Sequence, residues 1–149
     1  NRALLPPPGY RQLQALIGKP KGHDEDSMVE HAAHLVTMIG SPQHINLDKS
    51  RAFTRVLYRR SFSPAGVMQQ YLAVLCTGSL AAIDRQIRKP TLILHGSCDK
   101  LVTPAHGRAV AKAIHGAKFK LIDGMGHDIP DALAPKLAEL YTRHMQLHG

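Results

Sequence analysis

The sequence lacks the features that mark secreted and membrane proteins. Of its 149 residues, two are cysteine, none is tryptophan and 5% are aromatic. Cys76 and Cys98 do not make a disulfide framework, so we expect a reducing, cytoplasmic compartment. No apolar run approaches the ~18 residues of a membrane-spanning helix, and no secretory signal stands at the start. A hydrophobic content of 44% leaves an ordinary globular protein with no membrane partner.

Acidic residues are also few. The chain has 11 Asp and Glu against 19 Lys and Arg, which gives a formal charge of +8. Such a balance can favour polyanions. The basic residues are scattered, however, and no aromatic side chains interleave with them to stack on bases. We therefore expect solvated basic faces and no nucleic-acid partner.

The chain divides into two unlike parts. Residues 1–88 begin with a stretch rich in proline and glycine and continue with helical patterns, whereas residues 89–149 alternate strand and helix. We expect a linker and helical cap, or lid, followed by part of an α/β core. The helices expected in the first part cover 12–17, then run from Asp24 or Asp26 to Ile39, from Asp48 through Arg59, from Ser63-Pro64 to Gly78, and over Leu80–Arg85.

Two short apolar runs in the second part predict central or near-central strands, at 91–95 and 119–122. A helix is expected between them, from Thr103-Pro104 to Gly116, and a closing helix from Pro130 to about Leu147. This order predicts a right-handed parallel crossover. Two strands do not make a stable doubly wound sheet alone, so the sheet is expected to be incomplete without strands from elsewhere.

Each predicted strand ends in a loop that carries a residue suited to catalysis. Residues 96–99 (Gly-Ser-Cys-Asp) follow the first strand, and residues 124–128 (Gly-Met-Gly-His-Asp) follow the second. Open α/β sheets place their chemistry at the carboxyl ends of parallel strands. An Asp that orients a His is two thirds of a hydrolytic triad. Asp99 is thus the candidate acid that orients the histidine, and His127 is the candidate base. The plainer alternative is that Asp99 is a turn residue and His127 a loop residue, with no contact between them.

The segment 87–137 resembles the C-terminal part of an α/β-hydrolase. The resemblance is carried by Pro-Thr-Leu-Ile-Leu-His-Gly, by Gly-x-x-Asp-x-Leu-Val-x-Pro and by Ile-Asp-Gly-Met-Gly-His-Asp. In that family the Asp after the seventh strand orients the catalytic His after the eighth. The resemblance therefore implies these roles for Asp99 and His127. It also implies that residues 1–88 correspond to the helical cap inserted after the sixth strand.

The nucleophile of the triad is missing from the sequence. A catalytic serine sits in a Gly-x-Ser-x-Gly elbow between a strand and a helix, and the chain contains no such motif. The chain also opens on Asn1 rather than methionine. We therefore expect a fragment, the C-terminal half of a hydrolase that does not catalyse alone, with the N-terminal half of the fold as its partner.

Ester cleavage is the preferred function, with a small carboxylic ester as substrate and no cofactor. Residues 1–6 and 63–67 resemble bacterial esterases such as the aclacinomycin methylesterases. An Asp nucleophile would instead give haloalkane dehalogenase or epoxide hydrolase chemistry. A non-catalytic interaction protein derived from a hydrolase half is a third alternative, although exposed sheet edges then predict aggregation or tight pairing. Pairing with a second copy stays open.

Other candidate residues carry weaker signals. Met68, Tyr71 and Leu72 are candidates to line a substrate pocket under the cap, although apolar residues at helical spacing are more often core. His31 and His34 lie three apart on a helix, but no third metal ligand is evident. We therefore expect a solvated face there and no metal.

Three residues near the two motifs have ordinary interpretations. His95 ends a strand, where a packed or hydrogen-bonded histidine is usual. Cys98 is interpreted as a loop thiol with no role rather than a reactive one. Asp128 is a candidate to support His127, but an acid at the start of a helix is the plainer interpretation.

Overall fold

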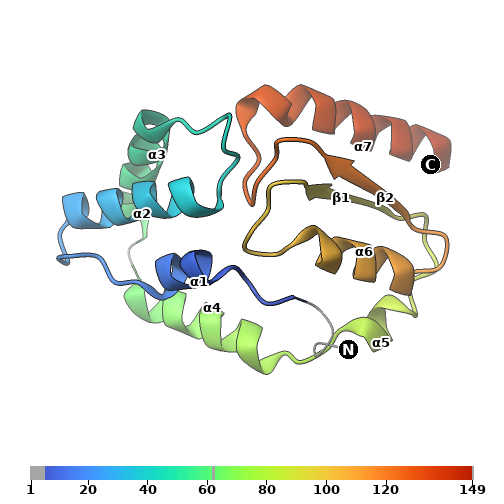
Figure 1. Ribbon diagram of the computed structural model, residues 1–149, viewed down its shortest axis with the longest axis horizontal. Helices are drawn as coiled ribbons and strands as arrows, with labels where there is room; N and C mark the ends of the chain where they lie inside the picture. Colours follow the sequence, from blue (N-terminus) through green and yellow to red (C-terminus); the bar gives the residue numbers. More distant parts are fainter. Residues whose placement is uncertain (1–5, 62, 149) are drawn as a thin grey trace.

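The computed structural model describes residues 6–61 and 63–148. Helices α1 to α4 form one region, and a two-stranded sheet with α5 to α7 forms the other (Figure 1). None of the helices in these residues is long and apolar enough to cross a bilayer. The elements are α1 (Tyr10–Ile17), α2 (Glu25–Ile39), α3 (Leu47–Arg60), α4 (Pro64–Cys76), α5 (Ala81–Asp84), β1 (Leu92–Gly96), α6 (Pro104–Ala113), β2 (Lys118–Ile122), the 3-10 helix η2 (Asp131–Leu133) and α7 (Ala134–His148).

Strands β1 and β2 pair in parallel, which confirms the parallel pairing predicted from the element order. Leu92 lies opposite Lys118, and Gly96 lies opposite Ile122. Both strands therefore end at the same edge of the sheet, and the loops that follow them lie next to each other. The Cys98 amide donates to the carbonyl of Met125 at 2.8 Å, which joins the two loops directly.

Helices cover both faces of this sheet (Figure 1). Helix α6 packs closely on one face, because a Cβ added at Gly107 would overlap the His95 ring. On the other face Ile122, only 1% exposed, forms a small apolar core with Met125 and Leu137 of α7. In a doubly wound sheet, helices cover the strands on both faces.

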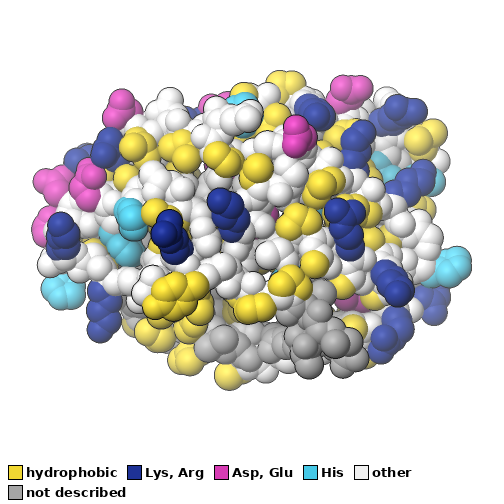
Figure 2. Space-filling view, viewed as in Figure 1, with side chains coloured by type: hydrophobic (Ala, Val, Ile, Leu, Met, Phe, Trp, Pro, Cys, Tyr) yellow, Lys and Arg dark blue, Asp and Glu magenta, His cyan; other side chains and the backbone are white. Residues whose placement is uncertain are grey.

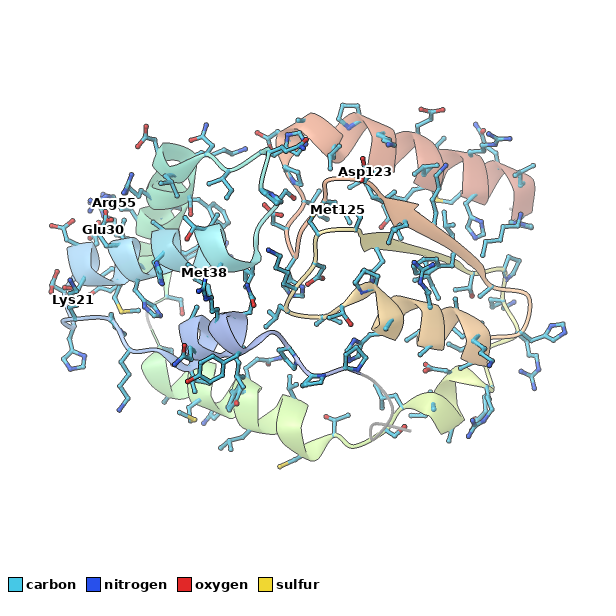
Figure 3. The ribbon with its side chains drawn as sticks, in the orientation of Figure 1. Lys21, Glu30, Met38, Arg55, Asp123 and Met125 are labelled. Carbon is cyan, nitrogen blue, oxygen red and sulfur yellow. The ribbon has the colours of Figure 1, made fainter. Side chains whose placement is uncertain are left out.

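The helical region is built around the pairing of α2 and α3. Val29 and Ala33 are the residues of α2 that become buried. Ion pairs join the exposed sides of the two helices, at the end where Figure 3 labels Glu30 and Arg55. These pairs are Arg51 with Glu30, Arg55 with Glu25 and Asp26, and Arg59 with Glu25.

These ion pairs shift the pKa values of their partners. The Arg59 guanidinium, hydrogen-bonded to Glu25, holds the pKa of that carboxyl below its usual value. The Arg51 guanidinium does the same to the pKa of Glu30. The pKa of Arg55 is raised, chiefly by its hydrogen bond to Asp26. The pairing of α2 with α3 is thus favoured by charge at its exposed side.

Most helix starts match the sequence expectation. Asp24 caps α2 by accepting from the Ser27 amide at 2.9 Å, and Ser63 caps α4 by accepting from the Gly66 amide at 3.1 Å. The cap predicted for α3 is wrong. Asn46, in extended conformation, accepts from the Lys49 amide at 2.9 Å, and Asp48 lies inside the first turn.

The closing helix also begins later than predicted. Pro130 is extended, with φ −71° and ψ 145°, so no helix starts there. A 3-10 turn over Asp131–Leu133 comes first, and α7 follows from Ala134.

The surface is large for a chain of this length. A compact monomer of 149 residues exposes about 7,500 Å², whereas this chain exposes 10443 Å². The chain is therefore less compact than a monomer of its length. Figure 2 shows apolar side chains along the lower edge of the view, where α1 and α4 lie, and Lys and Arg spread over the face. Large exposed apolar side chains on α3 and α4 include Phe53, Val56, Leu57, Met68, Leu72 and Val74.

Candidate functional site

Asp99 occupies the turn that follows β1, and its carboxylate is buried. Its Oδ1 accepts from the backbone amides of Leu101 and Val102, at 3.0 and 2.9 Å. An aspartate that bonds the amides two and three residues ahead stabilises its own turn. The second oxygen, Oδ2, is thereby left to face the neighbouring loop.

That oxygen meets the His127 ring. Nδ1 of His127 lies 2.9 Å from Asp99 Oδ2, across 28 residues of sequence. A carboxylate oxygen is an acceptor only, so Nδ1 carries the proton and donates it. The opposite nitrogen, Nε2, is then a free acceptor on a side chain that is 39% exposed. Among the described residues, no hydroxyl is hydrogen-bonded to Nε2.

His95 lies on the other side of the same carboxylate. Its Nε2 is 2.7 Å from the Val102 carbonyl and 3.6 Å from Asp99 Oδ2. The first contact closes the loop that holds Asp99, and it confirms the expectation of a hydrogen-bonded strand histidine. The second is too long for a hydrogen bond.

The loop that carries His127 turns sharply after β2. Gly124 has φ +72°, a left-handed conformation that favours glycine. Gly126 lies so close to Gly40 that an added Cβ would overlap the Gly40 carbonyl. The His127 amide donates to the carbonyl of Ile39 at 2.8 Å. The His127 side chain is thus hydrogen-bonded to Asp99 in the turn after β1, and the His127 backbone is hydrogen-bonded to Ile39 at the end of α2.

Asp128 does not start a helix, contrary to the plainer sequence interpretation. Its Oδ1 accepts from both the amide and the hydroxyl of Ser41, at 2.7 and 2.6 Å. The two residues lie 87 positions apart. No local pattern signals this contact, because it depends on how the two regions meet.

The remaining candidates lie elsewhere. Met68 and Leu72 of α4 are 56% and 50% exposed, and Tyr71 is half-buried. His31 and His34 line a shallow pocket between α1 and α2. Within the described ranges, no three His, Cys, Asp or Glu side chains gather as a metal site would need.

A groove runs beside the histidine loop, between α2, α3 and residues 128–132. Val36, Ile45, Phe53 and Ile129 give it apolar walls, and Asp128 lies at its margin. Polar and charged side chains, among them Lys49 and Asp131, also line it, and neither Asp99 nor His127 is among its lining residues.

Curated relatives of the chain are esterases. It is 26% identical to the rhodomycin D methylesterase DauP of Streptomyces sp. strain C5, over 94% of this chain and 48% of that protein. It is 25% identical to the rhodomycin D methylesterase DnrP of Streptomyces peucetius, with the same coverage. The chain thus spans about half the length of the curated relatives it matches. No family model matches it.

Solved structures with a similar fold are hydrolases. The esterase RhEst1 from Rhodococcus superposes with a TM-score of 0.66 at 18% identity, over 96% of this chain and 50% of that one. A meta-cleavage product hydrolase from Pseudomonas fluorescens gives 0.65 at 14% identity, over 97% and 54%. The enol-lactonase of Burkholderia xenovorans gives 0.64 at 18%, over 91% and 48%. The chain is therefore similar in sequence to methylesterases, and it has the fold of the C-terminal portion of an α/β-hydrolase.

Proposed function

We propose that Asp99 and His127 are the orienting acid and the general base of a serine hydrolase that cleaves carboxylic esters. The 2.9 Å contact between Asp99 Oδ2 and His127 Nδ1, with Nε2 left as a free acceptor, carries this proposal. The pair lies in the loops after two parallel strands, where open α/β sheets place their chemistry. The similarity to methylesterases supports an ester as substrate.

The two side chains have complementary tasks in this reaction. Asp99 fixes the proton on Nδ1, so Nε2 of His127 takes the proton of the attacking serine hydroxyl. The serine oxygen forms a bond to the ester carbonyl carbon, and the alcohol leaves with the proton that Nε2 returns. Water then attacks the acyl carbon while His127 Nε2 takes its proton; the bond to the serine oxygen breaks, the acid leaves, and Nε2 returns the proton to the serine oxygen.

The serine belongs to residues outside this sequence in our proposal. The sequence has no Gly-x-Ser-x-Gly elbow. Ser41 is bonded to Asp128, and Ser97 Oγ lies 3.2 Å from Asp123 Oδ1. The excess surface and the exposed apolar side chains of α3 and α4 support a partner that covers them, the N-terminal half of the fold.

The two regions take different parts in this scheme. Residues 1–88 act as the cap over the site, and residues 89–149 supply the acid and the base. The groove beside residues 128–132 is the pocket that the structure offers for the acyl or leaving group. Met68, Tyr71 and Leu72 stay predictions for the cap side of the pocket.

The test is hydrolysis of a short nitrophenyl ester by the native polypeptide that carries these residues. We expect His127→Ala to lower kcat/KM by about 10³-fold or more, since a serine without its base is a poor nucleophile. The matched control is His115→Ala, an exposed histidine in the turn after α6, which should leave activity unchanged. Full activity of the His127→Ala variant would contradict the proposal.

A further inference from the structure

Ser41 is the most completely bonded buried polar residue of the helical region. It follows the C-terminal end of α2, and its side chain has no exposed surface. Its amide and hydroxyl both donate to Asp128 Oδ1, at 2.7 and 2.6 Å. Its Oγ accepts from the Gly126 amide at 2.8 Å. Both hydrogen bonds of the hydroxyl thus run to the histidine loop.

These bonds belong to a continuous junction between two segments. Each of residues 39–41, at the end of α2, contacts a residue of the segment 126–128. The Ile39 carbonyl accepts from the His127 amide at 2.8 Å, Gly40 lies against Gly126, and Ser41 bonds Asp128. The approach of Gly40 and Gly126 is so close that neither segment can shift past the other without breaking buried bonds.

The histidine loop needs such a fastening. Between the end of β2 at Ile122 and the ring of His127 stand two glycines, Gly124 and Gly126, which restrict the backbone least of all residues. The ring itself is held by one hydrogen bond, to Asp99. Hydrogen bonds to a carboxylate in a buried place are among the stronger ones available. The loop therefore takes its position from α2 as much as from the sheet.

We propose that Ser41 and Asp128 are positioning residues, which fasten the His127 loop to α2 so that the ring meets Asp99 in the Nδ1–H form. The proposal rests on the proposed function for the role of His127, but its geometry stands without it. It also means that the helical region does not open as one lid hinged near residue 88. The end of α2 stays seated on the catalytic loop.

The experiment follows the tautomer of His127 by ¹⁵N NMR of the imidazole nitrogens in the native polypeptide. We expect the wild type to hold the neutral ring in the Nδ1–H form. Asp128→Ala should shift His127 toward the Nε2–H form and speed amide exchange at Gly126 and His127 by about tenfold or more. Asp128→Asn keeps an acceptor for Ser41 and should restore most of the wild-type tautomer ratio.

The matched control is Asp123→Ala, in the same loop but bonded to Ser97 rather than to α2. It should leave the His127 tautomer unchanged. If Asp128→Ala does not fold, Ser41→Ala serves, since it removes the acceptor of the Gly126 amide and should shift the tautomer in the same direction.

The outcomes separate the two proposals. If the wild type already holds the Nε2–H form, the role of Asp99 in the proposed function fails. If the wild type holds the Nδ1–H form and both Asp128→Ala and Ser41→Ala keep it, lowering only the melting temperature, the positioning role is overturned. We further expect Asp128→Ala to lower kcat for ester hydrolysis in step with the loss of the Nδ1–H form of His127.

Discussion

The two regions of the molecule are held together by different forces. In the helical region α2 and α3 pair through ion pairs at their exposed sides, and α3 buries no residue. In the sheet region Ile122, Met125 and Leu137 form an apolar core between the sheet and α7 (Figure 3 labels Met125). Charge pairing at a surface is weak and depends on pH and salt, whereas apolar burial does not. The candidate acid, Asp99, lies in the sheet region.

The histidine stands where the two regions meet. Its ring is bonded to Asp99 in the sheet region, and its backbone is bonded to Ile39 of α2. A histidine placed in this way depends on both regions. The comparison therefore predicts large functional effects at the junction and in the sheet, and smaller effects on the exposed side of α2 and α3.

The largest contrast is expected between two carboxylates. Asp99→Asn in the native polypeptide should lower kcat for nitrophenyl ester hydrolysis by about 10⁴-fold, because an amide no longer enforces the Nδ1–H form of His127. Glu30→Gln, on the exposed side of α2, should leave kcat within about twofold. A similar loss in both variants would mean that the function is not localised in the sheet region.

Packing provides the next contrast. Ile122→Ala should lower the free energy of unfolding by about 2–5 kcal/mol, because it leaves a cavity in the core beneath α7. Phe53→Ala, on an α3 side chain that is 62% exposed, should change it by less than about 0.5 kcal/mol in this chain. Urea unfolding monitored by circular dichroism gives both values. A large loss in Phe53→Ala would show that α3 is packed in solution.

The acid dependence of the helical region is a smaller effect with a definite sign. The pKa values of Glu25 and Glu30 are lowered in the folded state by Arg59 and Arg51. The folded state therefore binds fewer protons, and this stabilisation is present above about pH 4.5 and lost as the pH falls through the folded pKa values. The urea concentration at the midpoint of unfolding should therefore decrease as the pH is lowered through this range.

The control for this acid dependence is a double substitution. Glu25→Gln with Glu30→Gln should flatten the fall, whereas Glu139→Gln on α7, outside the ion-pair network, should not. If the urea midpoint of the double variant fell equally steeply with decreasing pH, groups other than Glu25 and Glu30 would cause the acid sensitivity.

Salt should give the smallest effect. At 1 M NaCl the Debye length falls to about 3 Å, which screens the pairs between α2 and α3. We expect a small drop in the melting temperature of the wild type and a smaller one in Arg51→Met, which lacks the pair with Glu30 but keeps those of Arg55 and Arg59. A larger drop in Arg51→Met than in the wild type would contradict this assignment.

Local patterns in the sequence predicted local structure well. Ser63 is the cap predicted for α4, and Asp24 is one of the two caps predicted for α2, Asp24 or Asp26, because a capping side chain bonds the amide three residues ahead. The parallel pairing of β1 and β2 followed from the helix between them. The cap of α3 is Asn46 rather than the predicted Asp48; both residue types favour the cap position, and they lie two positions apart.

Contacts between distant segments were beyond such patterns. The fastening of Asp128 to Ser41 joins residues 87 apart, and nothing beside either residue signals it. The delayed start of α7 depends on the extended conformation of Pro130. The Asp99 and His127 motifs were visible because each follows a strand, but only the structure supplies the 2.9 Å contact between them.

The central claim is that these residues supply the acid and base of an esterase whose nucleophile lies outside them. Its most direct test is labelling with a serine-directed fluorophosphonate, followed by mass spectrometry of the labelled peptide. The 149-residue chain alone should not be labelled, and the native polypeptide should be labelled on a serine outside these residues, with labelling abolished by His127→Ala. Labelling of a serine within the 149-residue chain, or labelling of the native polypeptide that persists in His127→Ala, would contradict the account.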